Sequence, residues 1–252
     1  MSKSASKSLV STISPPRLKA ISHRRCKDKL QRPQKQIHRN ELSLQSDEKN
    51  HVGMTKAIIL DMGGVILDLD MELCIRNFKE KAGFEGIEEY LDIYRQRGFI
   101  SNFEGGLIDE NGFYEECLKH CPAGTTPKVI EDCFCSLLVG AKPDMVRQIK
   151  ELSKSYTLYV LSNNNPICTR RFLRILEDEG IRDCFTGMFL SYKMGLLKPG
   201  RFIFDRVIES IGFKPEECLF VDDSIANVEG GRAAGLDSVL YKEGLNISDY
   251  VK

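Results

Sequence analysis

The sequence predicts an α/β protein with a doubly wound, Rossmann-like parallel sheet and an inserted, small, all-helical cap. Three observations lead to this fold class. An uninterrupted apolar run at residues 57–60 is typical of a strand that is buried on both faces of a sheet. Strand and helix patterns alternate from residue 143 onward, which is the order expected of a parallel sheet with flanking helices. Between these two parts lies a block of helical patterns without a strand.

The helical block accounts for the predicted insertion. Helical patterns cover residues 71–84, 87–97, 109–120 and 127–138, and residues 99–106 are expected to form a loop. Asp70 is a good N-cap for the first of these helices. We therefore predict a cap at residues 71–141 and a core made of residues 54–70 and 142–252.

The second half of the chain supplies the rest of the core. Pro143 is a favoured first residue of a helix, here extending to about residue 153. Further helices are expected at 167–179, 201–211 and 225–234, and strands at 156–161, 187–191, 218–221 and 238–241. Residues 162–166 and 222–224 form polar turns after two of these strands, and residues 193–199 form a loop.

The zero net charge of the chain conceals an uneven distribution. Residues 1–53 hold 12 Lys and Arg against 4 Asp and Glu, whereas the remainder holds 24 against 32. An acidic globular part argues against a nucleic-acid partner, because phosphate backbones attract clustered Lys and Arg. The Ser-rich basic arm is expected to be disordered. It could be an organelle transit peptide, a basic arm, or an over-extended start with Met54 as the true initiator.

Composition also bears on compartment. No apolar run approaches the ~18 residues of a membrane span, and no signal-peptide core is present. Nine cysteines without such a signal indicate a reducing compartment and free thiols. We therefore expect a cytoplasmic protein without a membrane partner, or an organellar one if residues 1–53 direct import.

Polar groups follow four predicted strands, at Asp61, at Ser162 and Asn163, at Lys198, and at Asp222 and Asp223. In open parallel sheets the carboxyl ends of the strands border the binding crevice. Their residue types fit one chemistry. A carboxylate can attack phosphorus, Mg²⁺ and a lysine can cancel the charge of the reactants, and a hydroxyl and an amide can hold the phosphoryl oxygens.

Four motifs in this order resemble those of the haloacid dehalogenase superfamily of aspartate-nucleophile phosphatases, in the branch with a helical cap after the first motif. They are ILDMGGV at 59–65, VLSNNN at 160–165, GLLKP at 195–199 and FVDDSIAN at 220–227. The cap stretch FEGGLID at 103–109 is similar to a loop of bacterial glucose-1-phosphate phosphatases. The resemblance covers the chain from Thr55 to its end.

The resemblance implies a role for each matching residue. Asp61 would be the nucleophile, Ser162 and Asn163 would bind the phosphoryl group, and Lys198 would balance the charge of Asp61 and the phosphate. These residues would act on a small phosphorylated metabolite, for which a sugar phosphate is one candidate.

The resemblance also implies a Mg²⁺ site. Asp61, the backbone oxygen of Gly63, Asp223 and the neighbouring Asp222 would be its ligands, and Asn227 would support them from outside.

One position departs from the family pattern. A second Asp, the usual general acid, commonly stands two residues after the nucleophile, where this chain has Gly63. Loss of general acid catalysis typically costs 10²- to 10⁴-fold in rate. Asp68 and Asp70 lie too far along the chain to replace it, and we interpret them as turn or cap residues. Glu104, in the cap loop, is a candidate for contact with the substrate.

Three alternatives to a phosphatase remain at this point. A 2-haloacid dehalogenase uses the same nucleophile on carbon without a metal, but Asp222 and Asp223 are better explained by a cation. A phosphomutase depends more strongly on the absent general acid. A phosphate-binding or regulatory module would have lost turnover through Gly63, although such a module has no need of Asp61, Lys198 and Asp223 together. No motif specifies the substrate or an oligomeric state.

Overall fold

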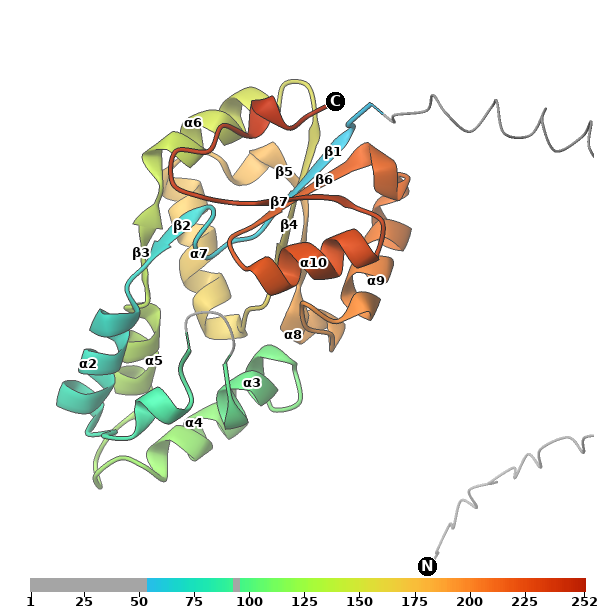
Figure 1. Ribbon diagram of the computed structural model, residues 1–252. Helices are drawn as coiled ribbons and strands as arrows, with labels where there is room; N and C mark the ends of the chain where they lie inside the picture. Colours follow the sequence, from blue (N-terminus) through green and yellow to red (C-terminus); the bar gives the residue numbers. More distant parts are fainter. Residues whose placement is uncertain (1–53, 93–95) are drawn as a thin grey trace, which may run out of the picture. The chain divides into compact units, whose positions relative to one another are not determined.

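The core is a parallel sheet of five strands in the order β5-β4-β1-β6-β7. The computed structural model describes residues 54–92 and 96–252. Figure 1 shows the sheet between two groups of helices, which confirms the predicted α/β class. The strands are β1 (Ala57–Leu60), β4 (Thr157–Ser162), β5 (Phe185–Leu190), β6 (Cys218–Asp222) and β7 (Asp237–Leu240).

The two faces of the sheet are buried under different helices. Ile58 and Leu60 point to one face, where α6 (Pro143–Leu152) and α7 (Pro166–Asp178) contribute to the same apolar cluster. Ala57 and Ile59 point to the other, with side chains of α9 (Arg201–Ile211). On that second face Gly231 of α10 (Ile225–Ala233) approaches the Phe220 ring. Burial on both sides explains why β1 is apolar throughout.

The predicted cap region lies between two short strands that leave and re-enter the core. β2 (Leu67–Leu69) and β3 (Leu138–Ala141) form an antiparallel pair. The helices between them, gathered below the core in Figure 1, are α2 (Met71–Ala82), η1 (Ile87–Glu89), α3 (Gly98–Glu104), α4 (Glu110–Leu118) and α5 (Pro127–Cys135). Asp70 caps α2 as predicted, since its carboxylate accepts a hydrogen bond from the Leu73 backbone at 2.7 Å.

One expected segment in this region was wrong, and two expected helices were too long. Residues 99–106 were expected to be a loop, but most of them form α3, because Phe99, Ile100 and Phe103 lie on one helical face and are buried. The helix expected at 127–138 ends at Cys135, and β3 follows it. The helix expected at 87–97 is reduced to the single turn η1, after which the Tyr90 ring packs on Phe84 and Phe99; residues 93–95 lie outside the described part.

The remaining elements lie close to their predicted positions. Residues 193–199, expected as a loop, begin inside a short helix, α8 (Ser191–Met194). Short 3-10 turns, all missed by the sequence patterns, complete the core: η2 (Arg182–Cys184), η3 (Pro215–Glu217) and η4 (Ile247–Asp249). The cysteines in the described residues are free thiols, buried or half-buried. No helix in the same residues is both long and apolar enough to cross a membrane. The predicted basic arm, residues 1–53, lies outside the described part.

Candidate active site

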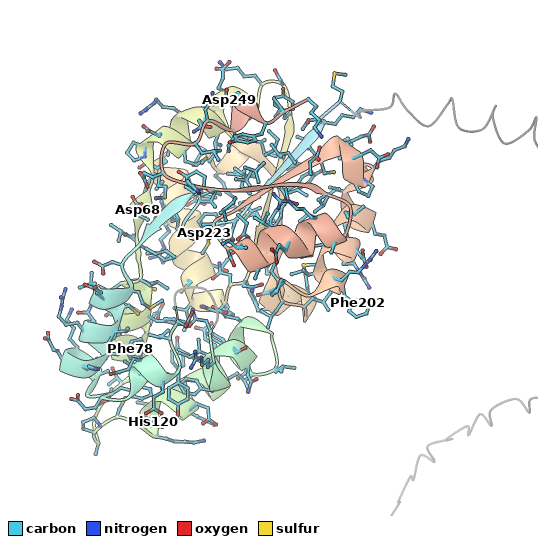
Figure 2. All side chains as sticks on the ribbon, viewed as in Figure 1. Asp68, Phe78, His120, Phe202, Asp223 and Asp249 are labelled. Atoms are coloured by element: carbon cyan, nitrogen blue, oxygen red, sulfur yellow. The ribbon has the colours of Figure 1, made fainter. Side chains whose placement is uncertain are left out.

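All but one of the polar residues predicted at the strand ends line one cavity of about 450 Å³; the exception is Asp222. Asp61 comes directly after the central strand β1, Ser162 ends β4, and Asp223 follows β6. Because β1 lies between β4 and β6, the parallel arrangement brings these three strand ends side by side. Lys198 enters from the loop between α8 and α9. Figure 2 labels Asp223 near the middle of the molecule, with Phe78 of α2 below it.

Lys198 holds two of the aspartates together. Its Nζ lies 2.9 Å from Oδ1 of Asp61 and 2.6 Å from Oδ2 of Asp222, and it donates to the Leu161 carbonyl oxygen at 2.9 Å. The lysine side chain is 1% exposed, so solvent does not compete for these contacts. Burial lowers the pKa of Lys198, but the charges of Asp222 and Asp61 outweigh burial, so the pKa is raised overall. The lysine is therefore a fixed positive charge against the Asp61 carboxylate.

Asp222 is anchored on all sides. Besides the Lys198 contact, its Oδ1 accepts hydrogen bonds from the Ser224 backbone at 2.9 Å and from Nδ2 of Asn227 at 3.0 Å. The side chain is fully buried, and it does not line the cavity. Asn227 therefore holds Asp222 in place, and its support of a metal site remains a prediction.

Asp61, Asp222 and Asp223 nevertheless form one carboxylate cluster. One oxygen atom from each lies within 4.8 Å of the other two. Burial raises the pKa of Asp61 from 3.8 to about 7, against the influence of Lys198 and reinforced by Asp222 and Asp223. The pKa of Asp223 is also raised, mainly by burial and then by Asp222. Three carboxylates and one lysine leave excess negative charge, and hard oxygen ligands at this spacing suit a divalent cation such as Mg²⁺.

The glycines after Asp61 permit this close arrangement. Gly64 has a φ of +76°, and a Cβ at that position would stand 2.1 Å from Oδ2 of Asp223. Only glycine fits there, for both backbone and steric reasons. Gly63 lines the cavity, and a Cβ there would meet only the end of the Leu69 side chain, at 3.0 Å. Its backbone oxygen as a metal ligand remains a prediction.

The two residues expected to bind phosphoryl oxygens differ in what they contact. The Asn163 side chain pairs with the Lys198 backbone, accepting from its N–H at 2.8 Å and donating to its carbonyl oxygen at 2.9 Å. Its amide thus fixes the lysine loop, and phosphoryl binding by that side chain remains a prediction. The Ser162 hydroxyl lies at the cavity wall and donates only a long hydrogen bond, 3.3 Å, to the Asn163 carbonyl oxygen.

The wall opposite the sheet comes from the predicted cap region. Ser101 and Glu104, one turn apart on α3, line the cavity. The pKa of Glu104 is raised to about 8, chiefly by burial and then by the Asp61 charge, while Lys198 opposes the rise. Apolar side chains complete this wall: Leu69, Phe134, Leu137 and Leu138.

Sequence reasoning missed Ser191, which joins the two walls. Its fully buried hydroxyl donates to the backbone oxygen of Glu104 at 2.6 Å and accepts from the backbone N–H of Asn164 at 2.9 Å. Ser191 follows β5, at the same edge of the sheet as the other site residues. A hydroxyl on the last residue of the strand predicted at 187–191 is the signal that could have identified it.

Comparisons with known proteins agree with this geometry. Residues 55–235 match the family model of haloacid dehalogenase-like hydrolases. The chain is 30% identical over 190 residues to D-ribitol-5-phosphate phosphatase of Bacteroides thetaiotaomicron, a match that covers 73% of this chain and 91% of that protein.

Two solved structures are also similar. A HAD family enzyme of Bacteroides thetaiotaomicron, crystallised with magnesium and inorganic phosphate, has a TM-score of 0.68 at 30% identity and covers 77% of this chain and 98% of its own. A HAD-like family hydrolase of Porphyromonas gingivalis has a TM-score of 0.68 at 32% identity, with 77% and 94% covered. With the four motifs gathered at one cavity, the family match shows that this chain belongs to the haloacid dehalogenase-like hydrolases.

Proposed function

We propose that the protein is a Mg²⁺-dependent phosphatase that hydrolyses a small phosphorylated metabolite, of the sugar or sugar-alcohol phosphate class, through an aspartyl-phosphate intermediate. The observation that carries this proposal is the placement of Lys198 between Asp61 and Asp222, beside the half-buried Asp223. A phosphate monoester is an anion, and the carboxylates repel it unless a cation is bound among them. The relatives described above, one a sugar-alcohol phosphate phosphatase and one crystallised with magnesium and phosphate, support the metal and the substrate class.

In this proposal the chain's residues divide the work of one displacement. Asp61 attacks phosphorus with one carboxylate oxygen, and Lys198 holds that carboxylate in place while offsetting its charge. Ser162 donates its hydroxyl to a phosphoryl oxygen. Asp61, the Gly63 backbone oxygen and Asp223 would hold Mg²⁺, which would supply positive charge to the phosphoryl oxygens when bound.

Asp222 has a positioning role in the same proposal. Both of its oxygens are already engaged by Lys198, Asn227 and the Ser224 backbone, so it keeps the lysine directed at Asp61. A water molecule then attacks phosphorus and releases phosphate from Asp61. The helices α2 to α5 act as the cap, which excludes bulk water and contacts the rest of the substrate.

The dehalogenase alternative is weaker on one observation. A dehalogenase displaces a halide from carbon and needs no metal. That reaction does not explain why two further carboxylates, Asp222 and Asp223, lie beside the buried nucleophile Asp61. A non-catalytic binding module would likewise retain a raised Asp61 pKa without using it.

The test is phosphate release from a panel of sugar, sugar-alcohol, nucleotide and acid phosphates, with Mg²⁺ or EDTA. Asp61→Asn keeps the shape of the side chain and removes the nucleophilic charge. We expect Mg²⁺-dependent release by the wild type and a loss of at least about 10³-fold in the variant. Release that survives EDTA or the substitution contradicts the proposal, and no release from any compound by folded protein with Mg²⁺ favours the binding module.

A further inference from the structure

The proposed phosphatase reaction needs a proton for the leaving group, and no residue described so far donates it. When the bond between phosphorus and a sugar oxygen breaks, the departing alkoxide needs a proton. Gly63 stands where the family commonly has the acid that supplies it. Glycine has no side chain that could donate a proton, so a protein side chain with this role must lie on another wall of the cavity.

Glu104 lies on the facing wall. It ends α3 and lines the same cavity as Asp61, Ser162 and Lys198. Ser101, one turn earlier on α3, lines the cavity together with Glu104. The apolar residues Phe99, Ile100 and Phe103 of the same helix are buried. A carboxyl group on this wall shares the cavity with Asp61, and it could contact the leaving group of a substrate bound there.

The end of α3 is held firmly against the core. Ser191 donates to the Glu104 backbone oxygen at 2.6 Å and binds the N–H of Asn164 at 2.9 Å. Two residues after Glu104, Gly106 has a φ of +70°, and a Cβ there would lie 2.3 Å from the Tyr192 carbonyl oxygen. These contacts position Glu104 relative to the core strand ends, as proton transfer requires.

The charge surroundings of Glu104 favour a neutral acid. Within the described residues, none donates a hydrogen bond to its carboxyl group or forms an ion pair with it. Burial is the main reason that its pKa is raised to about 8, and burial persists when a cation offsets the smaller contribution of Asp61. A half-buried carboxyl group without a charged partner in a cavity is a common arrangement for general acids.

We propose that Glu104 is the catalytic residue that protonates the leaving group. This inference rests on the phosphatase function proposed above. In the first step a bond forms between Asp61 and phosphorus, the bond to the sugar oxygen breaks, and that oxygen takes the Glu104 proton and leaves as an alcohol. In the second step water bonds to phosphorus, the Asp61 bond breaks, and the proton that water loses returns to Glu104.

Dependence on the leaving group tests this assignment. p-Nitrophenolate leaves as a stable anion without a proton, whereas a sugar or polyol alkoxide does not. We expect Glu104→Gln to lower kcat by about 10²- to 10⁴-fold on the best sugar or polyol phosphate of the panel. The loss on p-nitrophenyl phosphate should be below about 10-fold, because no proton is required.

Glu115→Gln is the matched control. It removes the same charge from an exposed position of α4 and should leave both rates unchanged. If Glu104→Gln does not fold, Glu104→Ala replaces it, and the unfolding transition of each variant is compared with the wild type.

Equal losses on both substrates in a folded Glu104 variant, or no loss on the sugar phosphate, overturn the assignment. Either result leaves the phosphatase proposal standing, because the wild type still hydrolyses both compounds. Failure of the phosphatase proposal shows differently, as absence of Mg²⁺-dependent release by the wild type.

Discussion

Asp61→Asn should make the metal-free protein more stable. Burial and the neighbouring acids raise the pKa of Asp61 from 3.8 to about 7. Above that pKa the folded protein carries a charge that the unfolded chain holds more easily in water. A pKa difference of this size corresponds to at most about 4 kcal/mol of unfolding free energy.

The substitution also removes a favourable contact. The neutral amide of the variant would weaken the 2.9 Å contact that Asp61 makes with Lys198, and hydrogen bonds to charged groups are worth about 1.5–3 kcal/mol. Lys198 keeps Asp222 and the Leu161 carbonyl oxygen, so it is not left unpaired. The raised pKa of Asp61 already includes this contact with Lys198, so the contact is not subtracted again, and the expected gain is at most about 4 kcal/mol near pH 8 in EDTA.

The sign follows from proton binding. Between the ordinary pKa and the raised one, folded wild type binds more protons than the unfolded chain, so the Asp61 contribution falls as pH rises from about 4 to 7. The advantage of the variant should consequently shrink near pH 5. Mg²⁺ should reverse the order near pH 8, because a cation that binds only the folded wild type stabilises it.

Urea unfolding followed by circular dichroism measures these differences, at about pH 5 and 8, in EDTA and in Mg²⁺. A variant less stable than wild type in EDTA near pH 8 would refute the reasoning. An advantage that stays the same at both pH values would show that desolvation of the Asp61 charge is not its cause.

Three further predictions concern the backbone, the cap and the metal. Gly64→Ala forces the Asp223 carboxylate to move, because a Cβ at residue 64 would lie 2.1 Å from it. The substitution should lower kcat by about 100-fold, and unchanged kinetics would refute the tight fit. Arg170→Ala removes the bidentate ion pair from α7 to Glu110 of α4, in which both hydrogen bonds are 2.8 Å long. The substitution should lower the free energy of unfolding in urea by about 1 kcal/mol, and Arg174→Ala, at an exposed position, should lower it less. Mg²⁺ affinity, measured by calorimetry, should fall up to about 10-fold from pH 7 to 6, because protons compete for the raised-pKa carboxylates; a flat profile contradicts this.

The strand ends could be predicted because their signals are local. An apolar run that stops at a carboxylate, followed by two glycines, already indicates a buried strand and a turn at Asp61. Chain order then assigns the other strand ends to the same edge of the sheet. The structure brings Asp61, Lys198 and Asp223 to one cavity, although their catalytic roles remain proposals.

The predicted cap region was harder to predict because tertiary packing overrides its local signals. The stretch FISNFEGG contains Ser, Asn and two glycines, yet burial of Phe99, Ile100 and Phe103 makes it helical. β3 became a strand only through pairing with the distant β2. Side-chain contacts were similarly hidden: neither the Asn163 pairing with the Lys198 backbone nor the Ser191 link to Glu104 has a signature in sequence spacing.

Covalent chemistry at Asp61 is the central step of the proposed reaction. The most direct measurement mixes excess enzyme, Mg²⁺ and the best substrate of the panel, quenches with acid, and weighs the protein and its peptides by mass spectrometry. We expect a phosphoryl adduct on the peptide that contains Asp61, formed and lost at rates compatible with turnover. Turnover without any adduct on that peptide at the earliest quench times, or an adduct on a different residue, would contradict the central claim.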